Sequence, residues 1–144
     1  GIRNTMVGQA GYQFDAEDDN LGIGHAALGG PVAGGEYNVA IGNFSLDALT
    51  SGDNNVAVGY NAGTGITTSN LNTIMGDAAA GYLATGDGRN TVIGKDCFTA
   101  GTALTTGSNN IALGERCKMS AANGTFQFVI GSNVTSAGSS TTTI

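Results

Sequence analysis

The sequence predicts an all-β protein: a parallel β-solenoid, or β-roll, of about eight coils with 16–20 residues in each coil. Three observations lead to this prediction: the composition, an apolar run that ends at a glycine and recurs along the chain, and a polar turn segment that keeps phase with it. The 144 residues include 25 glycines and one proline, and only 11% are charged, which is far from average globular usage. The length corresponds to one domain, residues 1–144. The repeats occupy about 4–134, and 135–144 form a polar tail or a connection to a further C-terminal part.

The repeat is a short apolar run between an asparagine and a glycine. Its glycines are 16 to 20 residues apart: Gly8, Gly24, Gly42, Gly59, Gly76, Gly94, Gly114 and Gly131. Four residues before the first seven of them stand Asn4, Asn20, Asn38, Asn55, Asn72, Asn90 and Asn110, and Gln127 takes this place in the eighth. Units of this length, repeated over nearly the whole chain, are too short to hold a helix and indicate stacked β-coils.

A polar turn segment separates the runs. "LTSGD" at 49–53, "ITTSN" at 66–70 and "LATGD" at 83–87 each begin seven residues after a repeat glycine. "LTTGS" at 104–108 begins ten residues after its glycine, so we expect a three-residue loop insertion within 98–103. Each unit therefore contains a strand, a glycine turn, a short second strand and a polar turn.

Stacking makes equivalent positions direct neighbours at ~4.8 Å. Opposite charges then fall beside each other, as with Asp96 and Arg116. We expect the asparagines to form a structural ladder with hydrogen bonds along the stack. Cys97 and Cys117 should also be neighbours, but parallel side chains would hold their β-carbons farther apart than the ~3.8 Å usual in a disulfide. We predict two buried free thiols.

The three positions before each glycine carry no charge and are mostly apolar, as in Val56-Ala57-Val58, and a strand that is apolar on both faces must be covered on both faces. We expect the first and third positions to point into the coil and the middle position to face outward. A self-complementary assembly that packs these strands around a shared axis would then cover the middle column. This column is the predicted interface between chains: Ala40, Ala57, Ile74, Val92, Ala112 and Val129.

The runs "NVAIGNFSL", "NVAVGYNAG" and "NIALGERC" resemble the repeats of the YadA-like head of trimeric autotransporter adhesins. They are still more similar to the N-T-x-x-G-Y-N-A-G repeats of phage tail fibres. This resemblance implies a left-handed roll and a homotrimeric fibre on a virion or a bacterial cell surface, with a role in attachment. The middle column is then the predicted trimer interface, close to a threefold axis. The coils here are longer than in the adhesin heads, and the link at residues 12–20 is irregular.

The expected function is therefore structural, a segment of a trimeric phage tail fibre that mediates host attachment. One alternative is a bacterial adhesin head that binds a host surface, matrix or glycan. The least favoured alternative is a polysaccharide-degrading tailspike, because no repeated column carries a pair of carboxylates.

We expect no enzyme activity, no cofactor and no metal. His25 is the single histidine and follows a turn glycine, where a surface residue is expected. The acidic residues Asp15, Glu17, Asp18 and Asp19 could ligate calcium, although a solvated loop is favoured. A net charge of −6 with five cations argues against nucleic-acid binding, and no apolar run is long enough to span a membrane.

Overall fold

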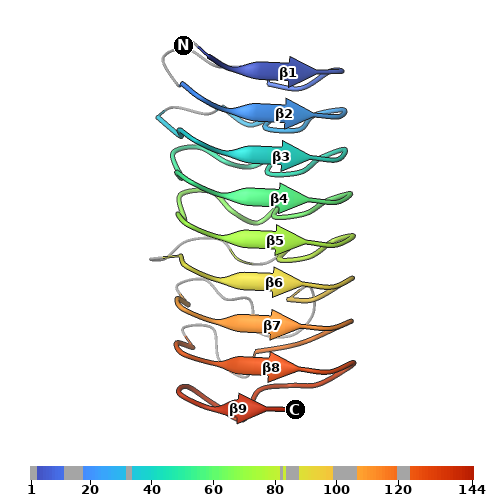
Figure 1. The fold of residues 1–144 in the computed structure, drawn as a ribbon, viewed down its shortest axis with the longest axis vertical. Coiled ribbons are helices and arrows are strands. Elements are labelled where there is room, and N and C mark those ends of the chain that lie inside the picture. Colours follow the sequence, from blue (N-terminus) through green and yellow to red (C-terminus); the bar gives the residue numbers. More distant parts are fainter. Residues whose placement is uncertain are drawn as a thin grey trace.

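The computed structural model describes residues 3–11, 18–31, 34–81, 83, 88–98, 107–119 and 124–144. In these ranges the chain is a parallel β-solenoid without a helix, which confirms the predicted all-β parallel solenoid of a single chain (Figure 1). Nine short strands form one sheet in chain order: β1 (Thr5–Val7), β2 (Leu21–Ile23), β3 (Val39–Ile41), β4 (Val56–Val58), β5 (Thr73–Met75), β6 (Thr91–Ile93), β7 (Ile111–Leu113), β8 (Phe128–Ile130) and β9 (Thr142–Thr143). Asp15, Glu17 and most of the expected insertion at 98–103 lie outside the described residues.

The strands pair in the register that the glycine spacing predicts. Ala40 pairs with Ala57, and Ala57 pairs with Ile74. Backbone hydrogen bonds continue this pairing beyond the strands, as from the Gly59 N–H to the Ile41 carbonyl at 2.8 Å. Residues 135–144, expected to be a tail, add a further rung, because Phe128 in β8 pairs with Thr142 in β9.

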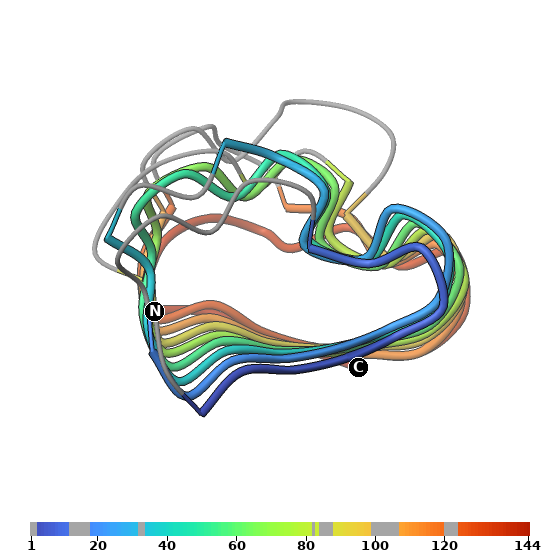
Figure 2. The same ribbon diagram turned by 90° about the horizontal axis from the view of Figure 1, so that it is seen from above.

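Seen along the rod, the coils superimpose as one flattened loop (Figure 2). The strands form one wall, the glycine turn closes one end, and the polar segment returns along the other wall. From the N-terminal end the chain runs anticlockwise as it recedes from the viewer, which is the sense of a left-handed coil.

The middle residue of each strand points into the coil, so the expected orientation of this column is wrong. Ala40, Ala57, Ile74, Val92, Ala112 and Val129 are all fully buried within the single chain. Because successive side chains in a strand point to opposite faces, the asparagine, the middle residue and the glycine share the inner face. These six residues therefore cannot line a contact between chains, and the first and third strand positions point outward instead.

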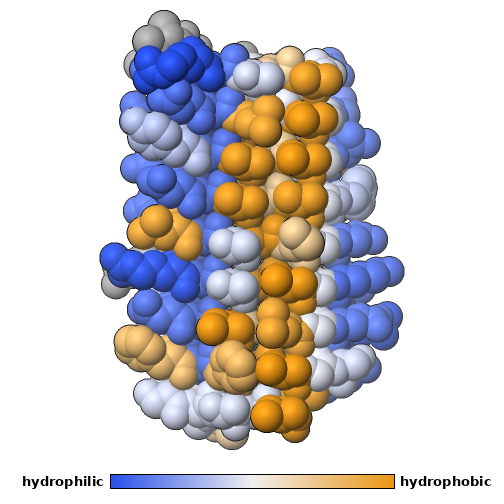
Figure 3. All heavy atoms as spheres, in the orientation of Figure 1, coloured by the Kyte–Doolittle hydropathy of each residue, from blue (hydrophilic) through white to orange (hydrophobic). Residues whose placement is uncertain are grey.

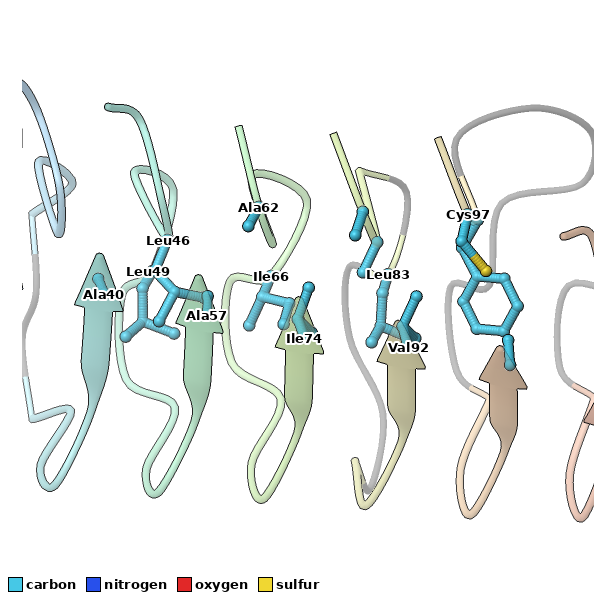
Figure 4. Close-up of a cluster of buried hydrophobic side chains, with 14 of the residues drawn as sticks. Ala40, Leu46, Leu49, Ala57, Ala62, Ile66, Ile74, Leu83, Val92 and Cys97 are labelled. Carbon is cyan, nitrogen blue, oxygen red and sulfur yellow. The ribbon is translucent and has the colours of Figure 1, made fainter. Parts of the chain in front are cut away.

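The interior is filled from both walls, with large residues opposite small ones (Figure 4). Leu46, Leu49 and Ile66 enter from the return side and are fully buried. A β-carbon placed on Gly63 would lie 2.8 Å from Leu46 Cδ2 and 3.3 Å from Ile74 Cδ1. Gly63 thus provides the space that Ile74 occupies, whereas the preceding strand has the smaller Ala57 at this position.

The glycine that ends each strand is required by contact with the next coil. Gly42, Gly59 and Gly76 have φ angles of +126°, +140° and +137°, which side chains rarely allow. A β-carbon on Gly59 would lie 2.4 Å from the Gly76 carbonyl oxygen, closer than any real contact. Successive coils therefore approach each other here through backbone alone.

Candidate functional site: the outer face of the sheet and the turn ridge

The asparagine column forms a buried hydrogen-bonded ladder inside the coil. Asn38 Oδ1 accepts from the Asn55 backbone N–H at 2.9 Å and from Asn55 Nδ2 at 3.1 Å. Asn55 Nδ2 also donates to the Ser69 carbonyl at 2.9 Å, which ties the strand to the polar turn of the same coil. The side-chain oxygens of Asn4, Asn20, Asn38, Asn55, Asn72, Asn90 and Asn110 each accept from the backbone of the next coil. The column is internal and satisfied, so its role is structural.

The two thiols are also internal. Cys97 and Cys117 are free and fully buried, and the Cys117 thiol donates a hydrogen bond to the Gly131 carbonyl at 3.2 Å. Burial raises the pKa of both thiols above the ordinary value. Neither group is placed to react with a ligand in solution.

Asp18 and Asp19, the two described members of the acidic cluster at 15–19, form ion pairs with Arg3. Arg3 Nε lies 2.6 Å from Asp19 Oδ1, and a second hydrogen bond joins Arg3 Nη2 to Asp19 Oδ2 at 2.7 Å. Asp18 is 3.9 Å from the same guanidinium. The hydrogen bond from Arg3 lowers the pKa of the Asp19 carboxyl. Within the described ranges no cluster of three or more His, Cys, Asp or Glu residues is arranged to hold a metal.

The first and third residues of β1–β8 form what we call the outer apolar face. Figure 3 shows it as two adjacent columns along the rod, one hydrophobic throughout and one in which paler, less hydrophobic side chains interrupt the hydrophobic ones. Several of these side chains are well exposed, including Val7 at 53%, Met75 at 49% and Ile93 at 38%. The face carries no charged residue: Thr5, Val7, Leu21, Ile23, Val39, Ile41, Val56, Val58, Thr73, Met75, Thr91, Ile93, Ile111, Leu113, Phe128 and Ile130.

The turn ridge lies beside this face and consists of the two residues that follow each repeat glycine. Its C-terminal half is charged: Arg116 Nη1 lies 3.1 Å from Glu115 Oε1, and Arg116 Nε lies 4.0 Å from Asp96 Oδ2, the neighbour that the register predicts. Its N-terminal half is aromatic, with His25, Phe44 and Tyr60 on three successive coils. His25 is exposed on this ridge, as expected for a surface turn residue.

Comparisons with protein-family models, with curated proteins and with solved structures found no match. Within the described residues there is no pocket and no helix long and apolar enough to cross a membrane. The features able to contact another molecule are therefore surfaces, the outer apolar face and the turn ridge. The outer apolar face was not predicted from the sequence, because each strand position was assigned to the wrong side of the strand. The two-residue alternation of side chains, counted from the asparagine as an inward position, would have predicted this face.

Proposed function

We propose that this chain is a structural segment of a trimeric extracellular or virion fibre, such as a phage tail fibre, that serves in attachment to a host surface. The observation that supports this most directly is the outer apolar face. It is continuous over eight strands, it has no charge, and soluble monomers rarely expose an apolar patch of that extent.

Further copies of the same chain are the best cover for this face. The side chains of the face repeat with the rise of one coil, ~4.8 Å, so a partner must have the same repeat to stay in step along the rod. Rotation about an axis parallel to the rod leaves the height of every coil unchanged. Each coil of one chain then contacts the equivalent coil of the neighbouring chain. A partner with a different repeat length could not keep such coil-to-coil contacts along the whole rod.

The interface in this proposal consists of the two outer columns. Val56 and Val58 flank the inward Ala57 in β4, and Thr73 and Met75 flank Ile74 in β5. Burial of exposed aliphatic side chains stabilises by ~25 cal/mol per Å² of apolar surface, so a contact along the whole face could hold chains together without any ion pair. The asparagine-to-glycine pattern runs through seven coils and continues in the eighth with Gln127 in place of asparagine, and the two outer columns continue with it.

The mechanical role follows from the fold. Nine strands give eight steps of ~4.8 Å, a rod about 38 Å long. Three such rods side by side would hold a distal attachment part at a fixed distance. Weak contacts on three identical faces would also add through avidity.

Light scattering tests the proposal. We expect the purified chain to have the mass of three copies, and Val56→Asp to lose that assembly because three carboxylates would be desolvated at one contact. Thr68→Asp is the matched control, since Thr68 is an exposed residue of the return side. We expect it to keep the trimeric mass. A stable soluble monomer of the original chain, or a trimer that persists in Val56→Asp, would refute the proposal.

A further inference from the structure

Three aromatic rings form a continuous row on the turn ridge. The His25 and Phe44 centroids are 5.1 Å apart with an interplanar angle of 85°, and the Phe44 and Tyr60 centroids are 6.1 Å apart at 89°. The row ends at Tyr60, which is 52% exposed. Both pairs have edge-to-face geometry, which aromatic rings favour. The contact with Phe44 supports the Tyr60 ring, which presents apolar surface to solvent.

Polar groups surround these rings in a fixed arrangement. The backbone N–H of His25 donates to Asn43 Oδ1 at 2.9 Å, and His25 Nδ1 is hydrogen-bonded to Gln9 Oε1 at 2.7 Å. Asn61 is held beside Tyr60 by a hydrogen bond from its backbone N–H to the Asn43 carbonyl at 3.0 Å. In the part of the chain that the structure describes, neither the Tyr60 hydroxyl nor the Asn61 side-chain amide makes a hydrogen bond.

Among the residues that directly follow a repeat glycine, Tyr60 lies between one with an amide side chain and one with a carboxylate side chain. Asn43 occupies the equivalent position one coil earlier, and Asp77 occupies it one coil later. All three residues directly follow a repeat glycine, so they are separated by the ~4.8 Å rise of the solenoid. Asn43, Tyr60 and Asp77 are all exposed. An apolar ring is thus flanked on both sides by groups that can exchange hydrogen bonds with hydroxyls.

The location keeps this cluster open in the proposed fibre. In Figure 2 the glycine turn forms the narrow end of the loop, round the corner from the strand wall that carries the outer apolar face. Chains that pack through that wall would leave the ridge at the periphery. The cluster would then appear three times around the rod.

We propose that the row ending at Tyr60 is a binding site for a neutral hexopyranose unit of a surface glycan. The apolar face of the sugar ring stacks on Tyr60, and its hydroxyls exchange hydrogen bonds with Asn61, Asp77 and Asn43. The inference deepens the proposed attachment function and rests on it, since three weak sites per fibre gain strength only through avidity.

Other ligand classes fit the same surface less well. The Asp77 carboxylate repels an anion at this position. An extended peptide would need an unpaired strand edge, whereas β3, β4 and β5 are paired on both sides. A buried anchor side chain would need a pocket, and none is found in the described residues. The C–H face of a pyranose chair can stack on an exposed aromatic ring without a cavity.

Saturation-transfer NMR with the methyl glycosides of glucose, galactose and N-acetylglucosamine tests the site. We expect transfer from the protein to the ring protons of at least one glycoside, and a decrease of about fivefold in Tyr60→Ala, as expected for the loss of an aromatic contact. Asp77→Asn, which keeps the shape of the side chain, should change the transfer without affecting folding. Tyr37→Ala is the matched control, because Tyr37 is 53% exposed but precedes β3 on the opposite edge of the strand wall.

The outcomes separate this inference from the proposed function. The mass by light scattering and the melting temperature are measured on the same samples, so a folded trimer that shows no transfer to any of the three glycosides overturns the sugar site alone. Transfer that is unchanged in Tyr60→Ala, or reduced equally in Tyr37→Ala, also overturns it. A decrease in Tyr60→Ala with normal transfer in Tyr37→Ala supports it.

Discussion

Asn72 accepts two hydrogen bonds from Asn90 through one side-chain oxygen. Asn72 Oδ1 lies 3.1 Å from the Asn90 backbone nitrogen and 3.0 Å from Asn90 Nδ2. The Asn72 amide in turn donates to Asn55 Oδ1 at 2.9 Å and to Ser69 Oγ at 3.0 Å. One side chain therefore links three coils and the polar turn of the preceding one. Asn72 is buried, and a buried polar group that loses its partner is costly.

Replacement of Asn72 by leucine should lower stability strongly. The change leaves the Asn90 backbone N–H without an acceptor and removes partners from Asn90 Nδ2 and Ser69 Oγ. Each buried group left unpaired costs about 1–3 kcal/mol, so we expect a loss of ~3 kcal/mol or more in the free energy of unfolding. Chemical denaturation followed by circular dichroism measures this loss.

Asn54→Leu is the control for Asn72→Leu. Asn54 is exposed, has a φ of 57°, and stands where the next coil carries Leu71 with a φ of 60°. Because the chain already uses leucine at this position, we expect a change of no more than ~1 kcal/mol. If Asn72→Leu were as stable as Asn54→Leu, the ladder would not be a stabilising element.

A methyl group on Gly59 should disrupt the contact between β4 and β5. The φ of +140° disfavours alanine, and its β-carbon would lie 2.4 Å from the Gly76 carbonyl oxygen. We expect Gly59→Ala to lose ~3 kcal/mol or more by thermal denaturation. Gly138→Ala separates the two causes, since its φ is +149° but the nearest atom, Thr141 Cγ2, is 4.0 Å away. Equal losses in the two variants would show that conformation alone requires the glycine.

Ile74 and Gly63 should be energetically coupled. Ile74→Ala leaves a cavity in the buried core and should cost about 2–5 kcal/mol. Gly63→Ala alone would crowd Ile74 and Leu46, whereas in the double variant its methyl group can enter the space left by Ile74. Gly63 has a φ of +70°, and Ala80 adopts +56° at the same place in the next coil, so alanine is tolerated by the backbone. We expect the double variant to lose less than the sum of the single losses, by a double-mutant cycle. Strict additivity would contradict the packing.

The buried thiols should make the protein less stable in alkali. Burial raises the pKa of Cys97, so the folded chain keeps this proton where an unfolded chain, with an ordinary thiol pKa of 9.0, loses it. The unfolded state then binds fewer protons, and the free energy of unfolding falls as pH rises above about 9. Urea denaturation at about pH 8 and about pH 10 measures the fall. A variant with Cys97→Ala and Cys117→Ala should show a smaller decrease in the free energy of unfolding between these pH values. An equal decrease in this variant would show that other groups cause the loss of stability.

The sequence predicted the coils and their register because both depend on spacing. The glycine spacing, the asparagine ladder and the pairing of Ala57 with Ile74 are direct consequences of stacking equivalent positions. The register of stacked coils does not depend on whether a side chain points inward or outward. A correct register therefore did not guarantee the correct orientation of each strand residue.

The orientation was wrong because the two positions that flank the middle residue of each strand were assigned to the interior. Val56 and Val58 are larger than Ala57, yet the narrow interior is already occupied from the opposite wall by Leu46 and Leu49. The two-residue alternation from the buried Asn55 places Ala57 inside and both valines outside. The contribution of the return wall could not be read from the strand, and neither could the aromatic row of the turn ridge, which depends on ring positions across three coils.

The hydrogen bonds between coils run along the rod, and this sets how the chain responds to tension. A pull on the two ends loads the rungs in series, so the terminal rung opens before those within the stack. A released coil of 17 residues, such as the one between Asn38 and Asn55, would add about 50 Å of length, because an extended residue spans ~3.3–3.6 Å and one rung only ~4.8 Å. Under load a single chain would lengthen in nearly equal steps, each ending at an asparagine, and neighbouring chains bound along the outer apolar face would delay the first step.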